Sequence, residues 1–175
     1  MKNSLLIPLL ALAGAAQAHI TLETPEAEAG RPYKAVLRVG HGCDGSATKQ
    51  IVVTLPDGLR GAKPMPKAGW TLTTTRKPLA SPGESHGKAI ADEPAEVRWT
   101  ANTEADQLQD AWYDEFTVRA TLPAEPGELW FKVRQVCVRG ESNWAEIPAP
   151  GKPAAAPAAR LKVVPARPAA SEHAH

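Results

Sequence analysis

The chain has 175 residues and a formal net charge of +1 at neutral pH, which is the size of one ordinary domain. Its balanced charge argues against nucleic acid as a partner, because phosphate binding needs clustered lysine and arginine. Beyond the first apolar run, no stretch is long enough to cross a bilayer, so no membrane span is expected after that run is removed.

The first 18 residues have the pattern of a secretory signal peptide. Lys2 precedes an apolar run over 5–16, and the small-x-small sequence at 16–18 follows it. Cleavage after Ala18 makes His19 the first residue of a periplasmic or secreted protein. The α-amine and imidazole Nδ1 of His19 can then chelate one metal ion, whereas an internal histidine offers only its ring. The alternative is that a histidine stands first by chance.

Residues 19–150 are predicted to form one all-β domain. Short runs rich in valine, threonine and aromatic residues are separated by proline and glycine, as at 56–58 and 82–83. The expected strands are 33–39, 50–55, 70–75, 96–100, 115–122 and 129–138. No sustained helical period is present, so the pattern predicts a β-sandwich.

The chain has two cysteines, Cys43 and Cys137. An exported protein meets an oxidising compartment, so a single disulfide is expected between them. Closing a loop of roughly 95 residues contributes about 4–5 kcal/mol in the chain-entropy model. The alternative is a pair of thiolate metal ligands, although the sequence has no Cys-x-x-Cys.

Residues 151–175 are rich in alanine and proline, and such low-complexity sequence cannot build a core. They are predicted to form a tail outside the domain, with at most a short edge strand over 160–165. The tail carries His173 and His175, which are either loose metal ligands or solvated side chains.

Several sequence blocks, in a fixed order behind the leader, carry a family resemblance. They are 19–26 with Gly30 and 33–39, then His41-Gly-Cys-Asp-Gly-Ser46, then 63–70, then 113–116, and last 136–137 with 144–148. Over His19 to about Pro150 the chain resembles the YcnI-like copper-binding domains of exported bacterial proteins. The resemblance implies an immunoglobulin-like or cupredoxin-like sandwich. It also implies a mono-histidine brace for Cu(II), made by the amine and Nδ1 of His19, a nearby glutamate and a packed tryptophan.

Three glutamates are candidates for the carboxylate ligand. Glu23 shares a strand face with His19, but it lies about 13 Å further along an extended strand. The turn over 25–30 can return Glu26 or Glu28 toward His19. Glu26 and Glu23 rank level and Glu28 third, and each is otherwise a solvated carboxylate.

Trp144 and Trp70 are the candidate aromatic neighbours of the metal, with ordinary core packing as the alternative. His41 and His86 stand in loop-like sequence, where either is an axial or transient ligand or a surface histidine. Polysaccharide-cleaving copper enzymes also begin with histidine, but they add a second histidine to the brace. In this chain that residue would have to be His41 or His86.

The main functional hypothesis is an exported, non-enzymatic protein that stores Cu(II) or delivers it to a copper-accepting protein. Nitrogen and carboxylate ligands favour Cu(II) over Cu(I). The ligands must be deprotonated, so binding is expected to weaken in acid. The alternatives are a non-metal adhesion or chaperone-like module and a copper-dependent oxidase or oxygenase. The sequence contains neither Gly-x-Ser-x-Gly nor His-Glu-x-x-His.

Overall fold

The computed structural model describes residues 19–85 and 88–167. The expected signal peptide at 1–18, His86, and the tail histidines His173 and His175 lie outside the described residues. Within the described ranges, no helix has the length and apolar character needed to cross a membrane.

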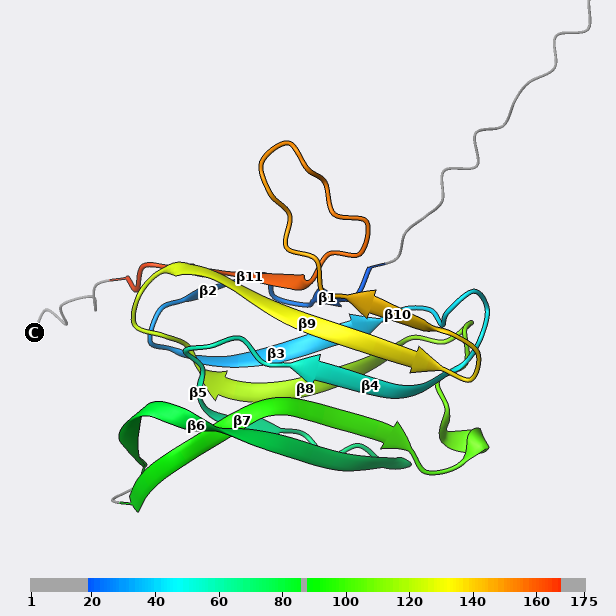
Figure 1. Cartoon of the computed structure of the whole chain (residues 1–175), viewed down its shortest axis with the longest axis horizontal. Helices are drawn as coiled ribbons and strands as arrows, with labels where there is room; N and C mark the ends of the chain where they lie inside the picture. Colours follow the sequence, from blue (N-terminus) through cyan, green and yellow to red (C-terminus); the bar gives the residue numbers. More distant parts are fainter. Residues whose placement is uncertain (1–18, 86–87, 168–175) are drawn as a thin grey trace, which may run out of the picture.

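The strands form two sheets that face each other (Figure 1). One sheet has the order β1 (Thr21–Leu22), β3 (Pro32–Val39), β8 (Asp114–Thr121) and β5 (Arg60–Pro64). The other has the order β2 (Glu26–Glu28), β11 (Ala159–Val164), β9 (Gly127–Cys137), β4 (Thr48–Thr54), β7 (Lys88–Ala101) and β6 (Trp70–Ser85), with β10 (Glu141–Trp144) also paired to β9. All pairings are antiparallel except that of β2 with β11. The predicted all-β sandwich is confirmed.

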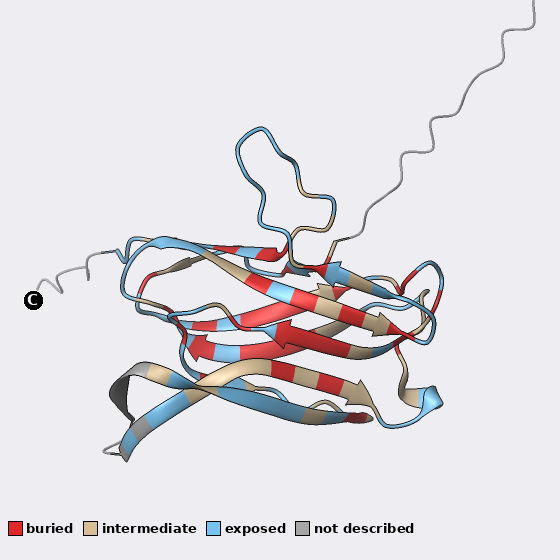
Figure 2. Ribbon diagram, in the orientation of Figure 1, coloured by how far each residue is buried: buried red, intermediate tan, exposed pale blue. Residues whose placement is uncertain are grey.

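The core lies between the sheets, and along strands such as β9 and β11 buried residues alternate with more exposed ones (Figure 2). Aromatic rings occupy its centre. The ring of Phe116 in β8 meets that of Trp99 in β7 at 5.5 Å and that of Trp70 in β6 at 5.2 Å, both edge to face. Trp70 is therefore a core residue that joins the two sheets.

The six predicted strands correspond to β3, β4, β6, β7, β8 and β9, and the ends of β3, β4, β8 and β9 agree with the prediction to within two residues. The hairpin of β6 and β7 is longer than predicted, because proline and glycine at 78 and 83 are absorbed by register shifts instead of ending the strands. The strands that were not predicted are β1, β2, β5 and β10. They contain two to five residues each, too few to show a period.

The structure differs from the expected organisation after residue 150. β11 is an interior strand, since it pairs with β9 on one side and with β2 on the other, whereas an edge strand was expected in a tail. Leu161 and Val163 alternate with charged residues and are buried in the core. Pro165 follows the strand, so it removes no hydrogen bond from the ladder. The packed sandwich thus extends through β11.

Residues 145–158, called the protruding loop below, connect β10 to β11 and extend away from the sheets (Figure 1). Glu146 closes its base with three hydrogen bonds. Its backbone N–H donates to Ala156 O at 3.1 Å, its carbonyl accepts from Ala158 N at 2.8 Å, and its carboxylate accepts from Ala155 N at 2.9 Å.

The tip of the protruding loop is a tight turn over 149–152. The N–H of Lys152 donates to the carbonyl of Ala149 at 2.9 Å, and Gly151 has φ of 73°. Proline followed by a left-handed glycine is the signature of a type II turn. The protruding loop is therefore ordered at both ends although most of it is exposed.

Candidate metal centre

His19 lies two residues before the start of β1, and this short strand fixes its position. Ile20 and Leu22 are each 3% exposed and belong to the core, and Thr21 pairs with Arg38 of β3. These two apolar side chains hold the segment that follows His19 against the sandwich. The half-buried His19 ring meets the ring of Trp144 edge to face, with 5.5 Å between centroids.

Trp144 is the last residue of β10 and pairs with Val133 of β9, which points its buried indole toward the core. The ring of His41 also meets this indole edge to face, with 6.3 Å between centroids. Trp144 therefore contacts both His19 and His41, which are 22 positions apart in the sequence. The sequence analysis named Trp144 as a candidate neighbour of the His19 site. It did not decide whether His41 is a metal ligand or a surface residue.

The segment that carries His41 ends in a tight two-residue turn. Cys43 N donates to Ser46 O at 3.1 Å, and Ser46 N donates to Cys43 O at 2.9 Å. Asp44 and Gly45 have φ of 48° and 76°. Two successive left-handed residues define a type I′ turn, for which aspartate followed by glycine is a preferred pair. The Cys-Asp-Gly-Ser sequence thus makes the loop after His41 rigid.

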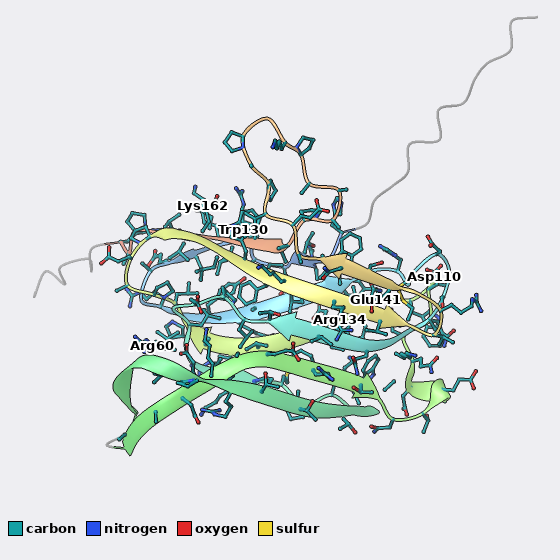
Figure 3. The ribbon with its side chains drawn as sticks, viewed as in Figure 1. Arg60, Asp110, Trp130, Arg134, Glu141 and Lys162 are labelled. Carbon is teal, nitrogen blue, oxygen red and sulfur yellow. A yellow bond between two sulfur atoms is a disulfide. The ribbon has the colours of Figure 1, made fainter. Side chains whose placement is uncertain are left out.

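Gly42 and Asp110 hold His41 from its other side. Gly42 N donates to Asp110 Oδ1 at 2.9 Å, and Asp110 lies on the loop before β8 (Figure 3). The ring Nδ1 of His41 donates to Gly42 O at 2.5 Å, since a carbonyl can only accept. This bond places the ring proton on Nδ1, so Nε2 is the nitrogen of the ring that carries a lone pair.

Substituting Gly42 is expected to destabilise the protein. A Cβ atom at Gly42 would lie 1.9 Å from Ser46 O, a backbone atom that can move only if the turn opens. We expect Gly42→Ala to lower the free energy of unfolding by about 1–3 kcal/mol, as for other overpacked sites. Chemical denaturation measures the change, with Gly40→Ala as the matched control because a Cβ there meets nothing within 4 Å. Equal stability of the two variants would contradict the close approach.

Gln135 of β9 connects Trp144 to His41 beneath the two rings. The indole Nε1–H of Trp144 donates to Gln135 Oε1 at 3.2 Å. Gln135 Nε2 donates to His41 O at 2.7 Å and to Thr48 Oγ1 at 2.8 Å. Sequence reasoning missed Gln135, but a signal was present: it stands between Val133 and Cys137 at a position whose neighbours in the alternation face the core.

The predicted disulfide between Cys43 and Cys137 is confirmed, with 6.0 Å between the Cα atoms. Cys43 lies two residues after His41, and Cys137 lies two residues after Gln135. The bridge therefore ties the His41 segment to β9 at the level of the Gln135 network. Because both cysteines are in the disulfide, neither offers a thiolate ligand.

Glu23 lies just beyond β1, exposed on the outer side of the four-stranded sheet, where its backbone N–H donates to Val36 O. Its charge is felt by two tyrosines. Burial, and secondly Glu23, raises the pKa of Tyr33 to about 12. The pKa of Tyr113 is also raised, and Glu23 is the smallest of its contributors.

Glu26 and Glu28 lie on β2, where each meets a cationic partner. Glu26 pairs with Lys162 of β11 at 3.1 Å, and Glu28 pairs with Arg31 at 3.6 Å and with Arg167 at 3.2 Å. Both carboxylates thus face charged neighbours along the edge of the larger sheet. The rings of His19 and His41, in contrast, both lie beside Trp144.

Two open hollows lie beside the two histidines, and one of them is also lined by Trp144. One, of about 450 Å³, is lined by His19, and the other, of about 480 Å³, by His41, Asp110 and Trp144, with the protruding loop contributing to both. Over 19–85 and 88–167, no three histidine, cysteine, aspartate or glutamate side chains gather in a metal-binding arrangement. A metal here would need the α-amine of His19 in addition to the two imidazoles.

These features define a disulfide-linked β-sandwich of the immunoglobulin-like class, with a histidine pair around one tryptophan. The chain belongs to the family described as Domain of unknown function (DUF1775), whose model matches residues 19–163. No curated protein matches the chain.

Two solved structures are similar to the chain. An uncharacterized protein from Nocardia farcinica, described as revealing an immunoglobulin-like fold, has a TM-score of 0.64 and 25% identity, over 83% of this chain and 97% of that one. A type I cohesin–dockerin complex from Clostridium thermocellum has a TM-score of 0.39 and 10% identity, over 83% of this chain and 98% of that one. The first similarity agrees with the fold described above.

Proposed function

We propose that this chain is an exported Cu(II)-binding protein whose ligands are the α-amine and Nδ1 of His19 and the Nε2 of His41. The observation that carries the proposal is that the rings of His19 and His41 both contact Trp144. The resemblance to YcnI-like domains implies a glutamate as the third ligand. We infer that His41 takes its place, because its ring lies beside the same indole as the ring of His19, whereas Glu26 and Glu28 are engaged with cationic side chains.

The donor set supports copper as the metal. Three nitrogens suit the tetragonal geometry of Cu(II), and an imidazole with its second nitrogen hydrogen-bonded to a carbonyl is a typical ligand. Both cysteines are in the disulfide, and the one methionine after residue 18, Met65, directly follows β5, which lies at the opposite edge of the four-stranded sheet from β1. Soft sulfur ligands for Cu(I) are therefore not offered beside His19. The disulfide in a small sandwich is typical of proteins outside the cytoplasm, which supports export.

The proposed role is storage of Cu(II) or its delivery to a copper-accepting protein, without catalysis. A metal held by three nitrogens from two residues keeps positions open for an incoming ligand. The two hollows beside His19 and His41 leave room for such a ligand from a partner. Exchange of ligands between two proteins would then move the ion without a free intermediate.

The experiment is a Cu(II) titration with electron paramagnetic resonance on protein that begins at His19. We expect a tetragonal, nitrogen-rich signal. We expect His41→Gln to weaken binding by at least about 10-fold, or about 1.4 kcal/mol. Glu26→Gln and Glu23→Gln are the matched controls, and each should stay within about 2-fold of the parent.

The outcomes separate the candidate ligands. If Glu26→Gln or Glu23→Gln weakens binding and His41→Gln does not, the site is the glutamate brace of the family resemblance. If no variant changes a tight affinity, the metal is bound elsewhere. If the parent protein binds no Cu(II), the copper proposal fails and a non-metal interaction module remains.

A copper-dependent oxidase is the second candidate, and the placement of His41 is the specific observation in its favour. Such enzymes use two histidines in the brace, and His19 and His41 lie around one indole. Peroxide-driven release of oxidised sugars from a polysaccharide by the Cu(II)-loaded protein would support this candidate. Absence of products under conditions where copper stays bound would leave the carrier function.

A further inference from the structure

We propose that Gln135 is the positioning residue of this centre: its side-chain amide sets the placement of the His41 backbone relative to the Trp144 indole. The inference rests on the proposed function and extends it to a residue that does not touch the metal. Gln135 lies in the middle of β9, and it is 0% exposed.

The side-chain amide of Gln135 both accepts and donates hydrogen bonds. Its oxygen accepts from Trp144 Nε1, and its two N–H groups donate to His41 O and to Thr48 Oγ1. A glutamine amide has two donors, so none is left over. Because one planar group makes all three bonds, a shift of the indole must be matched by a shift of the His41 segment.

The Thr48 hydroxyl extends this chain of hydrogen bonds. It accepts from Gln135 and lies 3.7 Å from Cys137 Sγ, which the hydroxyl proton can reach. The disulfide from Cys137 leads to Cys43 and so back to the turn that follows His41. These hydrogen bonds and the disulfide thus form one closed network through β9, which joins the His41 segment to Trp144.

The groups of this network are buried, so each of them needs its hydrogen-bond partner. A buried donor or acceptor that loses its partner costs free energy, so the network favours the one arrangement in which every member is bonded. No buried side-chain nitrogen or oxygen lacks a partner among the described residues. Gln135 therefore selects a single placement of the two groups that flank the proposed metal.

The experiment compares Gln135→Met with Thr117→Val. Methionine keeps the approximate size and removes every hydrogen bond, whereas Thr117 is a buried polar residue of the opposite sheet and is not part of the network. Gln135→Glu is the partial-rescue variant, because a neutral carboxyl retains one donor and one acceptor. We measure Cu(II) affinity and the electron paramagnetic resonance spectrum of each, together with its thermal unfolding.

We expect Cu(II) affinity to fall by about 10- to 100-fold in Gln135→Met, as for other residues that orient a metal ligand, and by less in Gln135→Glu. The spectrum should change in the same order, and Thr117→Val should match the parent whatever its stability. If Gln135→Met does not fold, Gln135→Glu alone must show the loss. Parent-like affinity and spectrum in a folded Gln135 variant would overturn the proposal.

A metal-free measurement separates this inference from the proposed function. In the nuclear magnetic resonance spectrum of the metal-free parent, the Trp144 indole proton should be protected from exchange, and its resonance should move in Gln135→Met together with the ring resonances of His41. Unchanged His41 resonances would contradict the coupling. A parent that shows the coupling but binds no Cu(II) would instead contradict the proposed function.

Discussion

Protein that begins at His19 is expected to bind Cu(II) at least about 100-fold more tightly than the same protein with one alanine placed before His19, a difference of about 2.7 kcal/mol. The added residue converts the α-amine into an amide nitrogen, which is not basic, and so removes one ligand atom and the chelate ring. A competition titration with a chelator of known affinity measures the difference.

The comparison has a built-in control for folding. Ile20 and Leu22 hold β1 in the core, and the added alanine precedes them. The two proteins should therefore have the same unfolding midpoint. Equal affinities would place the ion at another site, and the tail with His173 and His175 is the first place to look. A truncation after Arg167 would then abolish binding.

Removing the disulfide is expected to have the largest effect on stability. The bridge spans a sequence separation of 94 residues, and loss of such a native bridge typically costs about 2–5 kcal/mol. We expect the double variant Cys43→Ser, Cys137→Ser to lower the free energy of unfolding by this amount in urea denaturation. The variant removes the link between the His41 segment and β9, so its Cu(II) affinity should fall as well.

Reduction of the parent protein provides the control for this variant. Treatment with a thiol reductant followed by alkylation should give the same loss of stability without new serine hydroxyls. Stability equal to that of the oxidised protein in both samples would mean that the two sheets are held together by their packing alone. A loss of stability with unchanged affinity would mean that the Gly42, Asp110 and Gln135 contacts suffice to hold His41.

The sandwich could be predicted because its long strands alternate over seven or more residues, as in β3 and β9. The short strands could not, since the three residues of β2 and the two of β1 acquire their conformation from partners distant in sequence. β11 was expected at an edge because prolines surround it. Its place beside β9 depends on the return of the chain through the protruding loop, which no local pattern encodes.

In the candidate site, too, the features encoded by local sequence were predicted and those that depend on distant partners were not. His19 was predicted from the leader pattern and Trp144 from the family blocks, and both signals are local. The position of His41 depends on the pairing of Trp144 with Val133 and on the turn after Cys43. A glutamate ligand was implied by the family resemblance, and its candidates were ranked by strand face and by reach along the chain. The ion pair of Glu26 with Lys162 became visible only with β11 in place beside β2.

The protruding loop also gives the domain a place for added sequence. Its base is closed by Glu146 and its tip by the turn at Pro150 and Gly151, so a segment inserted between these two residues would leave both sheets intact. The same loop lines the hollows beside His19 and His41. A fluorescent reporter inserted at the tip would therefore be attached next to the centre without interrupting a strand, which makes this sandwich a suitable scaffold for a genetically encoded sensor.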